Sequence, residues 1–270
     1  MLKTRIWTAV ILLPLILSIL IAGSALQAGI LMGVVVVFVS YELGRMLSLP
    51  LVLQTDELCV ATCLFSIAGG FGVFALGAIE HGIASFWLLW AVLMAVCCLW
   101  PGDVRQKVAR MLITTFSGVY CGGGWLAMWH LYMLYPRASG LILMMTVVIV
   151  TDSAAYFGGT KWGRRKLAPT LSPGKSWEGF WCGIVASVVG AVLCNFAYGE
   201  MFGSMHFIAM LGICGASAGV VGDLIESALK RYAGVKDAGN LLPGHGGFLD
   251  RCDAAMFAAP VFVALLQNFS

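Results

Sequence analysis

Apolar residues fill long runs along this chain of 270 residues, and short polar segments separate the runs. A helix needs about 20 consecutive apolar residues to cross the hydrocarbon core of a bilayer. The runs predict nine transmembrane helices, over residues 6–25, 28–44, 58–79, 83–100, 112–134, 139–158, 179–199, 205–228 and 252–268. We therefore predict an all-α polytopic membrane protein with a single integral membrane domain over residues 1–270. Its N-terminal helices occupy residues 1–135, and the later helices with their cytoplasmic loops occupy residues 139–268.

The first apolar run follows Lys3 and Arg5, which is also the pattern of a secretory signal peptide. The apolar core of a signal peptide is roughly 7–15 residues long. The run over residues 6–22 is longer than this. We therefore expect a first transmembrane helix that is retained.

The basic residues indicate how the helices are oriented. With a cytoplasmic N-terminus, nine helices place fifteen of the 16 Lys and Arg residues on the cytoplasmic side and only Arg137 on the other. Cytoplasmic loops of membrane proteins carry such an excess of Lys and Arg. We expect a multi-pass protein of the inner (plasma) membrane, with its N-terminus in the cytoplasm and its C-terminus outside.

Composition agrees with this class of protein. Hydrophobic residues make up 60% of the chain and charged residues 11%, and the mean hydropathy is +0.94. The basic residues flank apolar spans without an aromatic stacking platform, so we expect no nucleic-acid partner. The nine cysteines lie mostly in the spans and form no CxxC pair, which favours a packing role.

Charge is concentrated in residues 227–253, which we call the charged window. It holds seven fixed charges: Lys230, Arg231, Lys236, Asp237, Asp250, Arg251 and Asp253. On a helix, Asp223, Glu226, Ser227 and Lys230 share one face because they are spaced at i, i+3, i+4 and i+7. This stripe predicts a helix that lines a hydrated cavity. Intrahelical salt bridges are the alternative interpretation.

The second half of the charged window combines a loop with a helix start. Pro243 and three nearby glycines exclude a regular helix there, and they allow the backbone to present amides to an anion. Asp250 and Asp253 follow at the start of the last span, where the helix dipole also favours bound anions. His245 belongs to this loop, either as a ligand contact or as an ordinary loop residue.

A second polar segment covers residues 151–179. Asp152 directly follows an apolar run, and ionisable groups at such depth usually face a cavity or a charged partner. A structural pair with one basic residue is the alternative, and the basic residues 161–166 are also explained as a membrane anchor. Gly174, Lys175 and Ser176 do not form a P-loop, because Pro169 stands where that motif requires glycine.

Carboxylates, basic residues and an amide-rich loop together indicate magnesium and phosphates. Magnesium takes a few carboxylates, with waters and phosphate oxygens as further ligands. Asp223 and Asp250 come from different helices, and we expect them to share one metal. The sequence contains neither a thiol and imidazole cluster suited to zinc nor a recognisable Ser–His–Asp arrangement.

Residues at fixed spacing in the charged window carry a family resemblance: Ser227, Leu229, Lys230, Arg231, Lys236, Asp237, Gly239, Leu242, Pro243, His245, Gly246, Gly247, Phe248, Asp250, Arg251 and Asp253. This series resembles the signature of the CDP-diacylglycerol synthase family, also called phosphatidate cytidylyltransferases. Cys252 departs from it, since the family usually has an aliphatic residue, Phe or Thr there. The stretches around Asp152 and Lys175 are also similar to the family, with Ala154 where glycine is common. The similarity is strong over about residues 145–260.

The resemblance implies that CTP and phosphatidic acid react to CDP-diacylglycerol and pyrophosphate with magnesium, and it associates a potassium ion with the site. We expect metal ligands at Asp223 and Asp250, and catalytic roles for Asp250, Arg251, Lys230 and Arg231. The expected substrate-binding residues are Asp152, Ser172, Lys175, Glu178, Ser227, Lys236, Asp237, His245, Gly246 and Gly247.

Of three other functions, two remain as alternatives. A transporter of an anionic solute also needs buried charge, but it predicts charge near the midplane, whereas here the polar residues lie toward the cytoplasmic side. The spaced aspartates of a CDP-alcohol phosphotransferase are not found. A CTP-dependent lipid kinase handles phosphates similarly, and the identity of the product separates it from a cytidylyltransferase. The partners are then CTP, phosphatidic acid and the bilayer, and a homodimer is one assembly that the sequence allows.

Overall fold

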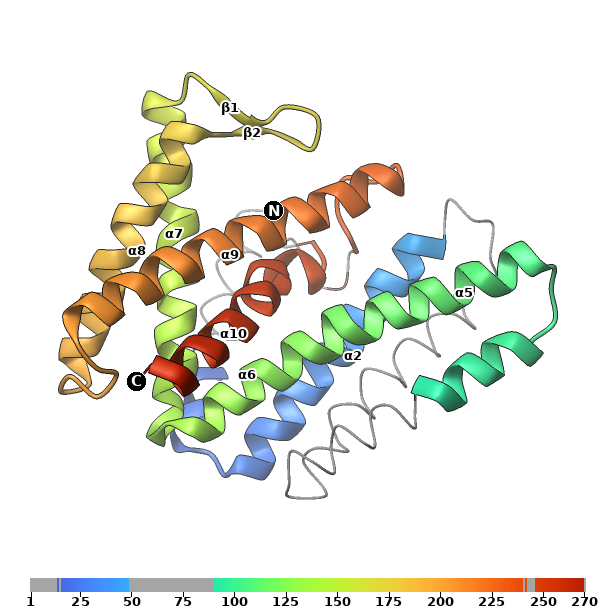
Figure 1. Ribbon diagram of the computed structural model, residues 1–270, viewed down its shortest axis with the longest axis horizontal. Helices are drawn as coiled ribbons and strands as arrows, with labels where there is room; N and C mark the ends of the chain where they lie inside the picture. The colour runs from blue at the N-terminus through green and yellow to red at the C-terminus, as the bar shows by residue number, and fades with distance from the viewer. Residues whose placement is uncertain (1–13, 15, 49–89, 240, 242–245, 270) are drawn as a thin grey trace. The chain divides into compact units, whose positions relative to one another are not determined.

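The computed structural model describes residues 14, 16–48, 90–239, 241 and 246–269 (Figure 1). In chain order, its numbered helices are α2 (Ala25–Ser48), α5 (Val104–Ser117), α6 (Gly123–Leu134), α7 (Ser139–Trp162), α8 (Trp177–Ala197), α9 (Met205–Tyr232) and α10 (Leu249–Phe269). A π-helical turn, η2 (Gly118–Gly122), joins α5 to α6, and a 3-10 turn, η3 (Pro136–Ala138), precedes α7. Two short strands, β1 (Lys166–Ala168) and β2 (Ser172–Ser176), lie between α7 and α8.

Four of the described helical stretches are long and apolar enough to cross a membrane: Ala25–Ser48, Pro136–Trp162, Trp177–Ala197 and Met205–Tyr232. A shorter apolar helix covers Trp90–Leu99. The protein is therefore a helical multi-pass membrane protein, as the apolar pattern predicted. The predicted span 58–79 and parts of the spans 6–25 and 83–100 lie outside the described residues, so the count of nine and the orientation stay predictions.

The observed helix ends differ from the predicted span ends where charged residues follow. Helix α9 begins at the predicted residue 205 but continues to Tyr232 instead of ending at 228. Helix α5 begins at Val104, eight residues before the predicted span, and Asp103 caps it by accepting a hydrogen bond from the Gln106 amide at 2.7 Å. Hydropathy marks only the apolar part of a helix. The helix itself continues beyond that part, through residues whose charged side chains reach water.

The chain forms two compact units. Unit 1 comprises Met1–Leu126 and Leu229–Cys252, and unit 2 comprises Ala127–Ala228 and Asp253–Ser270. The boundaries cross α6, α9 and α10, so these helices contribute to both units. Within unit 1, α2 packs against α5 and η2. The Trp90 indole N–H also donates to Thr115 Oγ1 at 3.1 Å, which joins the helix Trp90–Leu99 to α5.

In unit 2, α7 and α8 pack side by side, with the hairpin at one end of the pair (Figure 1). Glycines make this close approach possible. A Cβ atom at residue 179 of α8 would lie 2.6 Å from the Ala155 carbonyl oxygen, and one at residue 158 of α7 would lie 2.5 Å from Cys182 Sγ. Such distances lie inside van der Waals contact, so only glycine fits without displacing the partner helix.

The hairpin between α7 and α8 is the element that the apolar pattern did not predict. Strands β1 and β2 pair antiparallel, with Lys166 opposite Ser176. Ser176 ends β2 and caps α8, because its Oγ accepts a hydrogen bond from the Gly179 amide at 3.2 Å. The sequence between the two helices is thereby folded back, and Lys175 lies two residues before the start of α8.

A face of small residues on α9 receives neighbouring helices within unit 2. A Cβ atom at residue 212 would lie 2.9 Å from the backbone of Val188 in α8, and one at residue 215 would overlap the Phe262 ring of α10. At residue 222 it would lie 2.7 Å from the Asp253 carbonyl oxygen. Glycine at these positions brings the backbone of α10 against α9 at Asp253.

Candidate functional site

Three carboxylates gather in unit 2. Potential ligand oxygens of Asp223, Glu226 and Asp253 all lie within 4.8 Å of one another, and we call these residues the carboxylate cluster. Asp223 and Glu226 occupy successive turns of α9, and Asp253 comes from the first turns of α10. The close approach at Gly222 explains how Asp253 reaches them. Glu226 and Asp253 are buried, with exposed fractions of 1% and 8%.

The hairpin contributes a cation to this cluster. Lys175 Nζ of β2 lies 2.6 Å from Asp223 Oδ2, and both side chains are partly exposed. On the other side of the carboxyl group, Ser227 Oγ donates to Asp223 Oδ1 at 3.3 Å. Asp152 of α7 lies within electrostatic reach of both Asp223 and Lys175. The structure thus brings three predicted substrate-binding residues, Asp152, Lys175 and Ser227, near Asp223.

The chemistry of the carboxylate cluster fits a hard divalent cation. Three carboxylates close together repel one another, and Lys175 supplies a single positive charge at Asp223. Buried carboxylates are stable when they are paired or coordinate a metal. Magnesium prefers oxygen ligands and keeps waters or phosphate oxygens in its remaining positions. The donor set therefore fits magnesium.

Both carboxylate oxygens of Asp250 accept hydrogen bonds within unit 1. Its Oδ1 accepts from Lys230 Nζ at 2.8 Å, and its Oδ2 accepts from the backbone amides of Ala238 at 3.1 Å and Gly247 at 3.0 Å. The predicted catalytic residues Lys230 and Asp250 are thus an ion pair between the end of α9 and the start of α10. Charge-assisted hydrogen bonds of this kind fix the orientation of a carboxyl group.

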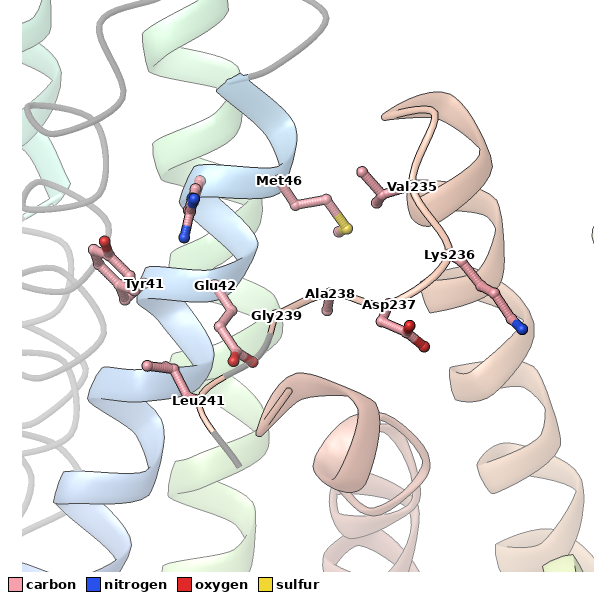
Figure 2. Close-up of a pocket in the computed structure, with 10 residues that line it drawn as sticks. Tyr41, Glu42, Met46, Val235, Lys236, Asp237, Ala238, Gly239 and Leu241 are labelled. Carbon is pink, nitrogen blue, oxygen red and sulfur yellow. The ribbon is translucent and has the colours of Figure 1, made fainter. Parts of the chain in front are cut away.

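A cavity of about 430 Å³ in unit 1 is lined in part by Ala238, one of the amide donors to Asp250. Its walls come from α2 and from the segment after α9, and they comprise Tyr41, Glu42, Arg45, Met46, Val235, Lys236, Asp237, Ala238, Gly239 and Leu241. Figure 2 shows the Glu42 carboxylate next to Gly239, whereas Lys236 and Asp237 point away from α2. Two predicted substrate-binding residues, Lys236 and Asp237, thus lie in the wall of a cavity.

The remaining predicted residues are placed as follows. Glu178 accepts hydrogen bonds from the backbone amides of Arg164 and Arg165 at 3.0 to 3.3 Å, so it holds the turn that leads into the hairpin. Ser172 begins β2 opposite Ala168. The other described members are Arg231 in the last turn of α9, Arg251 in the first turn of α10, and Gly246 and Gly247 just before α10; His245 lies outside the described residues.

The two expected metal ligands belong to different units. Asp223 is in unit 2 and Asp250 is in unit 1, so their sharing of one metal stays a prediction. The predicted metal ligands did not include Glu226 and Asp253, and the predicted site residues did not include Glu42. Glu226 and Asp253 carried a signal, namely their i, i+3 spacing to Asp223 and Asp250. Glu42 also carried one, because it is an ionisable residue inside an apolar run.

Comparison with known proteins gives consistent matches. The sequence pattern of the cytidylyltransferase family matches residues 3–269. The chain is 34% identical to the phosphatidate cytidylyltransferase of Pseudomonas aeruginosa over 282 residues, which covers 98% of this chain and 97% of that protein. It is 43% identical over 129 residues to the phosphatidate cytidylyltransferase of Haemophilus influenzae, a match that covers 46% and 45% of the two chains. For the phosphatidate cytidylyltransferase of Bacillus subtilis, the identity is 44% over 124 residues and 46% of each chain.

Proposed function

The chain belongs to the cytidylyltransferase family, and from this premise we propose that it is a phosphatidate cytidylyltransferase of phospholipid biosynthesis. This nucleotidyltransferase converts CTP and phosphatidic acid to CDP-diacylglycerol and pyrophosphate. The observation that carries the proposal is the similarity to a phosphatidate cytidylyltransferase over nearly the whole length of both chains. The described carboxylates and cations are of the kinds that a reaction between two phosphates needs.

The proposed reaction is a substitution at phosphorus. An oxygen of the lipid phosphate attacks the α-phosphorus of CTP, and the bond from that phosphorus to the bridging oxygen of the β-phosphate breaks. Pyrophosphate leaves with the electron pair of that bond. The second pKa of a phosphate monoester is about 6, so the nucleophile is largely ionised at neutral pH. A strong general base is therefore not required, and the main barrier is the repulsion between two polyanions.

We propose that basic side chains of unit 1 reduce this repulsion. Lys230 is held by Asp250, and Lys236 lies in the cavity wall. Together with Arg231 and Arg251, they offset the charge of the nucleotide phosphates and of the leaving pyrophosphate. Fixed cations and amides are most effective where charge develops in the transition state. The cavity beside Lys236 is the candidate site for the nucleotide.

In unit 2, we propose that the carboxylate cluster holds magnesium. When bound, this ion supplies charge neutralisation at phosphate oxygens. Asp223 is the member that also contacts Lys175, so this lysine is close to any phosphate that approaches the cluster. We assign Lys175 and Ser172 to the lipid phosphate and Asp152 to the cavity by which the lipid headgroup arrives, with Glu178 holding the hairpin turn. Participation of Asp250 as a further metal ligand and binding of potassium remain expectations from the family resemblance.

Labelled CTP tests the proposed activity. With purified protein, phosphatidic acid and magnesium, label in the α-phosphate of CTP is expected to enter the lipid fraction, and label in the γ-phosphate is expected to leave as pyrophosphate. A CTP-dependent kinase would transfer the γ-label to lipid instead. The control replaces phosphatidic acid with diacylglycerol, which lacks the attacking phosphate. Absence of α-labelled lipid with phosphatidic acid and magnesium would contradict the proposed function.

For topology, we propose nine spans in the inner membrane, with the C-terminus outside. A C-terminal fusion to alkaline phosphatase is then expected to be active, because this enzyme needs an oxidising compartment. The matched fusion to a fluorescent protein that matures in the cytoplasm is expected to be dark. A bright fluorescent fusion with an inactive phosphatase fusion would mean an even number of spans.

A further inference from the structure

Helix α2 carries a buried carboxylate that contacts the charged window from the other end of the sequence. Glu42 is 2% exposed. Its Oε2 accepts a hydrogen bond from the Leu249 amide at 2.9 Å, across 207 residues of sequence. A carboxylate inside an apolar helix is costly unless a donor satisfies it. The contact therefore needs an explanation beyond simple packing.

The partner of Glu42 is the N-terminus of α10. Leu249 is the first residue of this helix. The first amides of a helix have no partner within the helix, and the helix dipole places partial positive charge there. Glu42 thus caps α10 from a different helix. One turn earlier on α2, the Phe38 ring stacks on Phe248 with centroids 5.0 Å apart, which fixes the residue just before Leu249.

Two glycines of the charged window make room for Glu42. A Cβ atom at residue 239 would overlap Glu42 Oε1, and one at residue 247 would lie 2.5 Å from Oε2. The same Cβ at residue 247 would lie 2.9 Å from the Gly239 amide nitrogen. The carboxylate therefore occupies the space where side chains at both positions would stand. This explains in steric terms why the window has glycine at 239 and 247.

We propose that Glu42 is a positioning residue for Asp250. Glu42 fixes Leu249, which directly precedes Asp250, and packs against Gly247, whose amide donates to Asp250. It also packs against Gly239, which follows the other amide donor, Ala238. Glu42 thereby holds both backbone donors of Asp250 in register with Lys230. The inference rests on the proposed function only for the role of Asp250, because the contact itself is independent of the reaction.

A double-mutant cycle tests this proposal. Glu42→Ala is expected to raise the KM for CTP or the half-saturating magnesium concentration about tenfold or more, with the KM for phosphatidic acid within about twofold. Gly239→Ala alone is expected to cause a similar loss, because the new methyl group displaces the carboxylate. The double variant is expected to lose no more than Glu42→Ala, because the vacated space accepts the methyl group. Gly123→Ala, with open space around its Cβ position in α6, is the matched control and should behave as wild type.

Losses that multiply in the double variant would overturn the proposal. An effect of Glu42→Ala on kcat alone would also overturn it, because a smaller folded fraction lowers kcat without changing KM. Glu42→Gln retains an oxygen that accepts from Leu249, so it should recover most of the CTP affinity. If Glu42→Ala does not fold, Glu42→Asp serves in the same cycle, since its carboxylate is withdrawn by one methylene and leaves room at residue 239.

Hydrogen exchange at the Leu249 amide is measured in the same proteins without substrate. Faster exchange in Glu42→Ala but not in Gly123→Ala is expected, and equal exchange would contradict the contact. A wild-type protein without cytidylyl transfer would refute the proposed function, while this exchange result would still decide on Glu42.

Discussion

Replacing Asp250 by asparagine is expected to lower kcat/KM for CTP by about 100-fold or more, although the two side chains have nearly the same shape. Both oxygens of Asp250 accept from donors: Oδ1 from Lys230, and Oδ2 from the amides of Ala238 and Gly247. An asparagine has one acceptor oxygen, so its NH₂ group must face either the ammonium or the two amides. Either orientation places donors against donors and releases Lys230 or the loop.

Initial rates with labelled CTP measure this effect, and the thermal midpoint of unfolding reports whether the fold persists. Asp103→Asn is the matched control. Asp103 caps α5 by accepting from the Gln106 amide at 2.7 Å, and asparagine caps helices about equally well. Its activity should remain within about twofold of wild type. Full activity of Asp250→Asn would show that the ion pair with Lys230 has no role in the reaction.

Replacing Asp253 by asparagine is expected to remove the stabilisation that magnesium gives to the protein. A ligand that binds only the folded state stabilises it by about 2.7 kcal/mol at 100 times its dissociation constant. Binding of added magnesium to the carboxylate cluster should therefore raise the thermal midpoint of the wild type. Asp253 offers one of the three potential ligand oxygens of the carboxylate cluster and is 8% exposed. Its loss should abolish the magnesium-dependent rise and lower activity about 100-fold.

Without magnesium, Asp253→Asn is not expected to lower the thermal midpoint. In a chelator, Asp253→Asn removes one of three mutually repelling carboxylates, so its thermal midpoint should equal or exceed that of the wild type. Glu200→Gln is the matched control, because Glu200 is an exposed acidic residue of unit 2 that is not among the carboxylate cluster. An undiminished magnesium shift in Asp253→Asn would refute the assignment of the carboxylate cluster as a metal site.

The sequence predicted the helices well where apolar residues alone decide the structure. Helices α7 and α9 begin at the predicted residues because polar or turn-forming residues end the preceding segment. The hairpin was not predicted, since three- and five-residue strands carry too few residues for an alternating pattern. Its position depends on Glu178, which holds the amides of Arg164 and Arg165. Glu178 and these two amides are 14 and 13 residues apart in the sequence, so the helical or strand periodicity of hydrophobic residues does not predict the contact.

For the candidate site, residues on one helix were predictable and residues from different helices were not. Helical spacing alone places Asp223, Glu226 and Ser227 on one face of α9. The addition of Asp253 depends on the close approach of α10 at Gly222, which is a tertiary contact. Glu42 is a stronger case, because its partner Leu249 is 207 residues away. Averaging hydropathy over an apolar helix conceals a single carboxylate, although its cost of burial makes it informative.

Helix α9 has a length that bears on how a lipid reaches the protein. Its 28 residues make it about 42 Å long at 1.5 Å per residue, whereas the hydrocarbon core is about 30 Å thick. In the orientation proposed above, this surplus length lets the final turns, with Lys230 and Arg231, reach the cytoplasmic layer in which phospholipids carry their own phosphates. In that arrangement, a lipid substrate that diffuses within its leaflet would arrive with its phosphate at the height of these cations. Its acyl chains would stay in the hydrocarbon core. This avoids a free-energy cost of about 0.8 kcal/mol for each methylene that extraction into water would expose. The encounter is thus reduced to a two-dimensional search at fixed depth.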